Sequence, residues 1–371
     1  MNNIPVENSV AETDNTPIRV GIFRREFPDQ LTTLKAMSYM AKHFNVELFF
    51  FAIKDINFED NTVNAVRIDG DNRTREIIPI PKIIDNHPHV FWNENGDKVQ
   101  RLIRDHYFIR RANRLHSGKL VTKQTMHDIL LKDGRFKDYL IETHPVSSFK
   151  EFFALLTKYN QDVVMKPLNG SEGEGVTRIF FKNDSYVAHL KKKKFVLQTE
   201  DDLAKFYDEH FTDRRQILQP YIISRTRQGA PFDIRLHLRR GAEGKFNLFP
   251  YPRIGSQRGI VSNISAGGHT MPIKTFLQIE FGQRWRKIYN ELTEFAMNFI
   301  EFYQSLFRNT LYNVGIDVAI LRRGKDYEFK IFEINMSYLG STAIPIQAAI
   351  TSFEYYCYID RQLKEGKLNL P

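Results

Sequence analysis

Two carboxylates and an amide stand in apolar segments late in the chain. Asp317 lies in GIDVAI, and Glu333 and Asn335 lie in KIFEINMS. Residues two apart on a strand share a face, so Glu333 and Asn335 point the same way. If the two strands are neighbours, the three side chains offer hard oxygen ligands of the kind that bind Mg²⁺ beside nucleotide phosphates. Acids in such apolar strands need compensation, so a buried ion pair with a basic strand residue is the alternative.

A lysine precedes a glycine-rich segment at 163–176, VVMKPLNGSEGEGV. Alternation with Val163 and Met165 places Lys166 near the end of a strand. Glycines beyond it would let backbone amides approach phosphate oxygens, and the lysine would add a positive charge. The segment has neither the P-loop spacing nor the dinucleotide fingerprint, so an ordinary β-hairpin with a solvent-exposed lysine explains it equally well.

The segment FDIRLHLRR at 232–240 alternates strictly between apolar and polar residues. Its polar row contains Asp233, Arg235, His237 and Arg239. Such a strand forms either the floor of an anion site or a solvated face, and the solvated face is the commoner outcome. A Gly- and Ser-rich loop at 253–268 then offers Arg253, Arg258 and Asn263. Such a loop suits transient phosphate contact, although it is equally consistent with an ordinary surface loop.

These residues need strands and helices to position them. The apolar patterns predict strands at 18–23, 46–53, 82–85, 313–321 and 328–335, and short antiparallel strands across 162–263. They predict helices at 30–43, 123–131, 149–159, 285–307 and 343–363. The early order of strand, helix and strand indicates a small α/β domain at 18–115, after a loose tail at 1–17.

Composition limits the class of protein. The 371 residues carry a net charge of +9, with 42% hydrophobic and 26% charged residues, which is typical of globular proteins. One cysteine cannot form an internal disulfide, and no apolar run is long enough to span a bilayer. The first residues lack the basic start and apolar core of a secretory signal, so we expect a cytoplasmic protein without membrane contact.

The positive charge is local. Segments 98–123 and 213–258 each carry a surplus of seven basic residues, so the rest of the chain is acidic on balance. This indicates a cationic cleft for an anionic partner. The phenylalanines follow core patterns and no nucleic-acid motif is present, so we expect no nucleic-acid partner.

The order of these motifs along 116–350 resembles the ATP-grasp superfamily. The sequence looks most similar to the spore-coat-associated YheC/YheD group and to the ribosomal-protein glutamate ligases, and PKIIDNHP at 81–88 adds to the former likeness. The resemblance implies an α+β fold in which two α/β lobes sandwich ATP, preceded by a small pre-ATP-grasp domain. It implies a small lobe with the glycine loop at 116–212 and a large lobe with the metal site and the C-terminal helix at 213–371.

The resemblance also implies roles for individual residues. The metal ligands for Mg²⁺ or Mn²⁺ would be Asp317, Glu333 and Asn335, and Arg235 and Asn263 would act on the γ-phosphate and the acyl phosphate. The ATP-binding residues would be Lys123, Lys166, Gly170, Ser171, Gly173, Gly175, Gln219, Pro220 and Tyr221. One departure is that the residues after Asn335, MSYLG, lack the proline that usually follows in such ligases.

The implied reaction is ADP-forming ligation of a carboxylate to an amine through an acyl phosphate. Its partners would be ATP, an acidic small molecule or peptide, and an amine acceptor, with a homodimer as the expected assembly. No general base stands out, and His237 and His269 are candidates by location only. The alternatives are an ATP-grasp kinase that phosphorylates a hydroxyl, and a spore-coat or scaffold protein with a vestigial ATP site.

Overall fold

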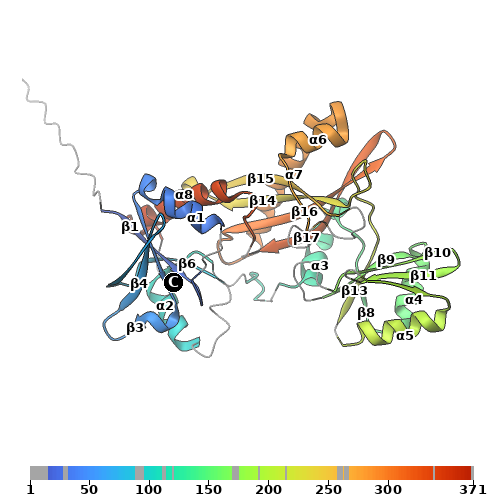
Figure 1. Cartoon of the computed structure of the whole chain (residues 1–371), viewed down its shortest axis with the longest axis horizontal. Coiled ribbons are helices and arrows are strands. Elements are labelled where there is room, and N and C mark those ends of the chain that lie inside the picture. Colours follow the sequence, from blue (N-terminus) through green and yellow to red (C-terminus); the bar gives the residue numbers. More distant parts are fainter. Residues whose placement is uncertain are drawn as a thin grey trace, which may run out of the picture. The chain divides into compact units, whose positions relative to one another are not determined.

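The chain forms two units, each with its own core. The computed structural model describes residues 16–27, 32–87, 96–110, 114–118, 121–168, 175–190, 193–213, 215–256, 262, 267–336 and 339–368. Unit 1 comprises Met1–Arg110, Arg240–Lys245 and Ile344–Pro371, and unit 2 comprises Arg111–Arg239 and Phe246–Ala343 (Figure 1). Unit 1 is therefore assembled from three separate stretches of sequence.

A seven-stranded sheet organises unit 1 in the order β3-β4-β2-β1-β6-β7, with β5 paired to β4. The strands are β1 (Ile18–Phe23), β2 (Val46–Phe51), β3 (Ile56–Asn57), β4 (Thr62–Asp69), β5 (Asn72–Pro79), β6 (Ile83–Asn86) and β7 (Tyr107–Phe108). β1 pairs in parallel with both β2 and β6, and β6 pairs in parallel with β7. β4 and β5 form an antiparallel hairpin.

The described part of unit 1 also contains the helices α1 (Thr32–Met40), α2 (Gly96–Asp105) and α8 (Pro345–Lys364), with short 3₁₀ turns η1 (Ala41–Phe44), η2 (Ile53–Asp55) and η5 (Ala242–Gly244). The resemblance implied that the C-terminal helix belongs to the large lobe, whereas α8 packs against α1, β1 and β6. The reason is its aromatic face, in which Phe353 stacks on Phe44 with ring centroids 5.0 Å apart and Tyr356 is fully buried. Burial of these aromatic rings stabilises the packing of α8 in unit 1.

The first sheet of unit 2 is six-stranded, in the order β12-β11-β10-β9-β13-β8. Its strands are β8 (His144–Val146), β9 (Asp162–Pro167), β10 (Thr177–Lys182), β11 (Ser185–Leu190), β12 (Lys193–Leu197) and β13 (Gln216–Pro220). All its pairings are antiparallel, as the sequence predicted. Helices α4 (Phe149–Lys158) and α5 (Glu200–Phe211) bury Phe152 and Leu203 against Val163 and Met165.

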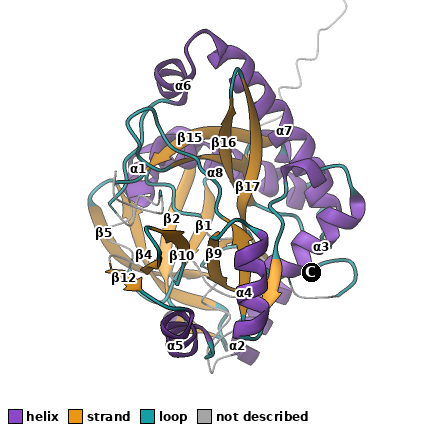
Figure 2. Ribbon diagram, turned by 90° about the vertical axis from the view of Figure 1, so that its right-hand side faces the viewer, coloured by secondary structure: helices purple, strands orange, loops and turns teal. Residues whose placement is uncertain are grey.

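The second sheet of unit 2 is four-stranded, in the order β15-β14-β16-β17. Its strands are β14 (Phe232–Arg240), β15 (Phe246–Ile254), β16 (Asn313–Arg323) and β17 (Asp326–Met336). Helices α6 (Ile273–Phe281) and α7 (Trp285–Ser305) share one apolar core with this sheet, and Figure 2 shows α7 running beside its strands. Helix α3 (Lys123–Asp133) and the turns η4 (Lys137–Tyr139) and η7 (Gly282–Arg284) complete the named helices of this unit.

The parallel strands of unit 1 pack so closely at Gly21 that no room remains for a side chain. A Cβ atom at this position would lie 2.5 Å from Cε1 of Phe51 on the neighbouring strand, where real Cβ contacts do not occur. We therefore predict that Gly21→Ala lowers the free energy of unfolding by roughly 1–3 kcal/mol, the usual cost of overpacking. Urea unfolding measures the change. Gly340→Ala is the control, because nothing lies within 4 Å of its added Cβ, and an equal loss in both variants would contradict the packing argument.

Candidate functional site

The four-stranded sheet of unit 2 has one apolar and one polar face. On β14, Ile234, Leu236 and Leu238 enter the core that includes α7. The alternate residues Asp233, Arg235, His237 and Arg239 are also buried. The interpretation of this row as a solvated face is therefore wrong: β14 is an interior strand between β15 and β16, and its polar residues are removed from water.

The register of the strands brings the predicted acidic residues beside the predicted arginine. Arg235 on β14 lies opposite Asp317 on β16, and Asp317 lies opposite Glu333 on β17. The amide nitrogen of Asn335 is 3.2 Å from Oδ2 of Asp317 and 3.4 Å from Oε2 of Glu333. Four of the predicted site residues thus form one polar group on three adjacent strands.

Two arginines hold the carboxylates in this group. Arg235 donates from Nε to Oδ1 of Asp317 and from Nη2 to Oδ2 at 3.0 Å. Arg253 on β15 donates to both oxygens of Asp233 at 2.7 Å and lies 2.8 Å from Oδ2 of Asp317. The Ser262 hydroxyl donates to Oδ2 of Asp233. We call Asp233, Arg235, Arg253 and Asp317 the ion-pair network.

The two acids of the network have opposite pKa shifts. Burial acts to raise the pKa of Asp317, but Arg235 and Arg253 outweigh it and leave the pKa below its ordinary value. Burial also raises the pKa of Asp233, and there it prevails, because Arg253 is opposed by the negative charge of Asp317. Asp317 is consequently the firmly ionised member of the pair.

Asp317 has the surroundings expected under each of the two interpretations that the sequence left open. Asp317 forms the buried ion pair expected of an acid in an apolar strand, with 2% of its surface exposed, and it also lies beside Glu333 and Asn335. The roles of Arg253 and Asp233 were not predicted, and the sequence pattern placed Arg253 in a loop. The signal was present in the strand alternation, which puts Asp233 on the same face as Arg235.

His237 continues the polar row beyond Arg235. It is fully buried, and neither ring nitrogen has a hydrogen-bond partner. Burial, followed by the charges of Arg239 and Arg235, lowers its pKa well below the ordinary value, so the ring is neutral. The other histidine considered, His269, is exposed, and its backbone pairs with Ile254.

A second polar group lies in the six-stranded sheet. The ammonium of Lys166 donates to Oε1 of Gln219 at 2.7 Å, and Gln219 donates to the Thr143 hydroxyl at 2.8 Å. Tyr221, which follows β13, bonds through its backbone N–H to Asp162 at 3.0 Å, and the Arg178 guanidinium lies 3.7 Å from its ring centroid. The structure thus places four of the predicted nucleotide-binding residues on or directly after the paired strands β9 and β13, namely Lys166, Gln219, Pro220 and Tyr221.

The structure describes only some of the remaining predicted residues. Lys123 is the first residue of α3, after the N-cap Thr122. Gly175 has a φ of +75°, and a Cβ there would lie 2.9 Å from Cγ of Pro167. Three residues of the glycine loop and one of the acyl-phosphate residues lie outside the described residues, namely Gly170, Ser171, Gly173 and Asn263.

A divalent cation would require the amide of Asn335. Among the described residues, no three His, Cys, Asp or Glu side chains gather in an arrangement suited to a metal ion. The carboxylates of Asp317 and Glu333 nevertheless both lie within hydrogen-bond distance of the side-chain nitrogen of Asn335, so rotation of the amide would turn its oxygen toward both acids. Two carboxylates and an amide oxygen form a donor set that suits Mg²⁺. These residues therefore fit such an ion.

Comparison with solved structures identifies the class of fold. D-alanyl-alanine synthetase A from Vibrio cholerae O1 biovar eltor superposes over 96% of this chain and 99% of its own, with a TM-score of 0.52 and 12% identity. N5-carboxyaminoimidazole synthetase from Staphylococcus aureus covers 92% of this chain and 77% of its own, with a TM-score of 0.50 and 11% identity. At such low identity the likeness concerns the fold, an α+β ATP-grasp architecture.

Sequence comparison identifies the family. The family model of YheC/D-like ATP-grasp proteins matches residues 113–349, so the chain belongs to this family. Endospore coat-associated protein YheD of Bacillus subtilis is 23% identical over 84% of this chain and 71% of its own length. Endospore coat-associated protein YheC of the same organism is 22% identical over 57% of each chain. The family resemblance expected from the motifs is confirmed.

The ion-pair network gives a test of its energetics. We predict that Arg253→Met lowers the free energy of unfolding by about 3–5 kcal/mol near neutral pH, because it leaves Asp233 buried without its partner. The double variant Arg253→Met/Asp233→Leu should recover most of this loss, since no charge then remains uncompensated at that position. Chemical denaturation measures both values.

The matched control is an exposed pair. Lys245 contacts Glu243 at 2.8 Å, and both side chains are mostly solvated, so Lys245→Met should leave stability unchanged. A loss for Arg253→Met no larger than that of the control would show that the network contributes little to folding.

Proposed function

We propose that the protein is an ATP-dependent, ADP-forming ligase that joins a carboxylate to an amine through an acyl phosphate. The observation that carries the proposal is the convergence of Arg235, Asp317, Glu333 and Asn335 on one sheet face. Membership of an ATP-grasp family supports the proposal independently. The substrates of the synthetases named above belong to those proteins and do not identify the acid or the amine here.

The nucleotide would be bound by the residues of the six-stranded sheet. The Lys166 ammonium, already held 2.7 Å from Gln219, would neutralise phosphate charge together with Lys123. Gly175 and the glycines before it would supply backbone donors to the phosphates. The backbone of Gln219, Pro220 and Tyr221 would contact adenine. This assignment extends the family likeness to the positions of this chain.

The proposed reaction consists of two displacements, in which positively charged and polar side chains stabilise the negative charge on oxygen. A carboxylate oxygen of the acid attacks the γ-phosphorus, the bond to the β-phosphate oxygen breaks, and ADP leaves. The amine nitrogen then bonds to the acyl carbon as inorganic phosphate departs, and the amine gives up its protons to the phosphate and the solvent. Arg235 and Asn263 would stabilise the negative charge on the transferring and departing oxygens.

A divalent cation held by Asp317, Glu333 and Asn335 would supply charge neutralisation between the β- and γ-phosphates. The protein's contribution is to hold these three side chains on rigid strands and to keep Asp317 ionised through Arg235 and Arg253. Positioning of this kind can supply much of the rate enhancement in phosphoryl transfer, because little covalent work remains for the protein.

We predict that Glu333→Gln abolishes ADP formation from ATP in the presence of an acid and an amine, because it removes one of two carboxylates from the cation site. Circular dichroism and a thermal transition close to that of the wild type would show that the fold persists. Glu328→Gln on the same strand is the control, since Glu328 pairs at the surface with Arg323. Wild-type turnover by the Glu333 variant would contradict the site assignment.

The proposed catalytic role of Arg235 can be tested by the size of the loss in kcat when the side chain is replaced. Removal of one donor to a developing oxyanion commonly costs on the order of 10²–10³ in rate. We therefore predict that Arg235→Met, measured in the folded fraction, loses at least 10²-fold in kcat. Arg239→Met is the control on the same strand; its guanidinium donates to the Tyr312 hydroxyl at 2.8 Å. An equal loss in both variants would indicate a structural rather than a catalytic effect of Arg235.

Two alternatives make different predictions in the same assay. An ATP-grasp kinase would transfer phosphate to a hydroxyl, so hydroxylamine would trap no acyl group and ADP release would not depend on an amine. A scaffold with a vestigial site would not bind Mg²⁺-ATP in calorimetry. The reason to include it is that the two Bacillus relatives are endospore coat-associated proteins. Acyl hydroxamate formation favours the ligase over both.

The setting of the proposed reaction is the cytoplasm, with a homodimer as the expected assembly. No helix within the described part of the chain combines the length and apolar character needed to cross a bilayer. The proposed partners are ATP, an acidic small molecule or peptide, and an amine.

A further inference from the structure

A chain of hydrogen bonds crosses three neighbouring strands of the six-stranded sheet. The Lys166 ammonium donates to the side-chain oxygen of Gln219 at 2.7 Å, and the Gln219 amide nitrogen donates to the Thr143 hydroxyl at 2.8 Å. The Thr143 hydroxyl donates in turn to the carbonyl oxygen of Ile141 at 2.8 Å. All four residues belong to unit 2. The chain extends the proposed nucleotide site from Lys166 and Gln219 to Thr143.

The pairing of the strands brings these side chains together. β13 pairs with β8 on one side and with β9 on the other, and both pairings are antiparallel. The first pairing continues to the first residue of β8, so Thr143, which precedes that strand, comes beside Gln219. On β9, Gln219 lies opposite Val164, and Lys166 is two residues further along. Because residues two apart on a strand share a face, Lys166 lies diagonally across from Gln219.

The orientation of the Gln219 amide is fixed from both ends of the chain. An ammonium can only donate, so the amide must turn its oxygen toward Lys166. The Thr143 hydroxyl gives its one proton to Ile141, so it can only accept from Gln219. The amide must therefore turn its nitrogen toward Thr143. The two ends require the same orientation.

Burial makes this orientation matter. Gln219 is 8% exposed, whereas Thr143 and Lys166 are half-buried. A buried amide that loses a hydrogen-bond partner keeps an unsatisfied polar atom, which is costly. Without the Thr143 hydroxyl, the amide would be free to turn over and to present its nitrogen, a donor, to the ammonium. The hydroxyl thus selects the orientation in which Gln219 holds Lys166.

We propose that Thr143 is a positioning residue of the nucleotide site: it orients the Gln219 amide, which holds the Lys166 ammonium ready for a phosphate oxygen. This inference rests on the proposed function, in which Lys166 neutralises phosphate charge. A side chain that is held before the ligand arrives loses less conformational entropy on binding, so the arrangement strengthens nucleotide binding. Gln219 suits this role because it accepts from the ammonium and adds no negative charge beside the phosphates.

The test is calorimetric titration of the full-length protein with a non-hydrolysable ATP analogue in the presence of Mg²⁺. We expect Thr143→Val, which keeps the shape of the side chain but loses the hydroxyl, to weaken binding by about tenfold or more. Thr143→Ser keeps the hydroxyl and should bind within about threefold of the wild type. Thr157→Val is the matched control, because the Thr157 hydroxyl donates to the carbonyl oxygen of Phe153 within α4 at 3.0 Å and should not affect binding.

A second background separates positioning from folding. A carboxylate at position 219 has two acceptor oxygens, so either orientation presents one of them to Lys166 and the Thr143 hydroxyl is no longer needed. Addition of Thr143→Val to Gln219→Glu should therefore weaken binding less than about twofold relative to Gln219→Glu alone. A merely structural role of Thr143 predicts the same loss in both backgrounds.

The outcomes distinguish this inference from the proposed function. The inference alone is wrong if the wild type binds the analogue and Thr143→Val binds it as tightly. It is also wrong if Thr143→Ser loses as much affinity as Thr143→Val, or if Thr143→Val costs as much in the Gln219→Glu background as in the wild type. A wild type that does not bind the analogue contradicts the proposed function, and the inference fails with it.

Discussion

The compensation of two buried carboxylates by two arginines is the constraint on which the four-stranded sheet of unit 2 depends. Asp233 and Asp317 are 3% and 2% exposed, and an isolated charge at such depth would neutralise or disrupt the fold. Arg253 contacts both acids and Arg235 contacts the second. The polar face inside the protein therefore depends on the pairing of each buried acid with an arginine from a neighbouring strand.

Local backbone features maintain that register. Gly315 has no side chain, and a Cβ there would lie 3.0 Å from Cδ of Arg235, so the glycine leaves room for the arginine to reach Asp317. A β-bulge shifts the register of β16 and β17 between Asp317 and Val318. Because of it, Ile331 and Ile334 on β17 both pack toward the apolar core, although Glu333 between them points to the polar face. The bulge thus places an acid beside Asp317 without removing an apolar neighbour from the core.

This arrangement shows what the sequence could predict. Alternation on β14 correctly separated Ile234 and Leu236 from Arg235, and spacing correctly joined Glu333 with Asn335. Local patterns also located α4, α7 and the antiparallel strands of the six-stranded sheet. All of these depend on interactions within a few residues or between sequence neighbours, which periodicity records directly.

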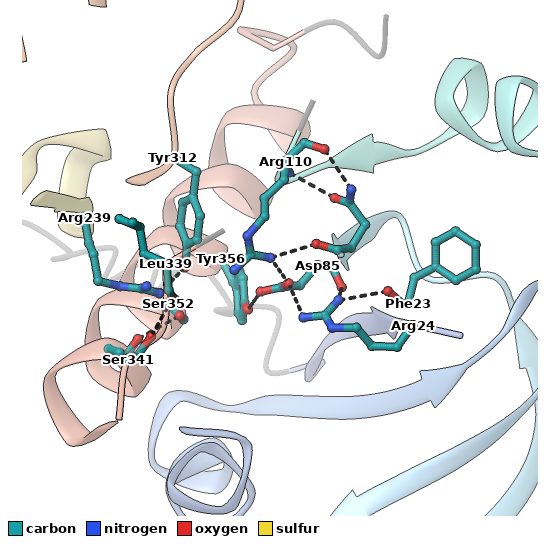
Figure 3. Close-up of polar contacts among 12 residues, drawn as sticks. Phe23, Arg24, Asp85, Arg110, Arg239, Tyr312, Leu339, Ser341, Ser352 and Tyr356 are labelled. Atoms are coloured by element: carbon teal, nitrogen blue, oxygen red, sulfur yellow. Dashed lines mark hydrogen bonds and ion pairs between the residues drawn. The ribbon is translucent and has the colours of Figure 1, made fainter. Parts of the chain in front are cut away.

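What the sequence did not reveal depends on partners far along the chain. β14 is buried because it lies between β15 and β16. Arg253 reaches Asp233 because it lies on β15, in a stretch whose composition had indicated a loop. The packing of α8 in unit 1 depends on two contacts between residues distant in sequence. Phe353 stacks on Phe44, and Tyr356 bonds to Asp85, which is 271 residues away (Figure 3). Strand alternation cannot specify such contacts, because it gives the face of a residue and not its neighbour.

The central claim is that the polar face of β14, β16 and β17 holds the cation of a bound nucleotide. The most direct measurement is anomalous scattering from crystals grown with Mn²⁺ and a non-hydrolysable ATP analogue. The account predicts a manganese peak within coordination distance, roughly 2–2.5 Å, of oxygens from Asp317, Glu333 and Asn335. A nucleotide bound with its manganese away from these three side chains would contradict it.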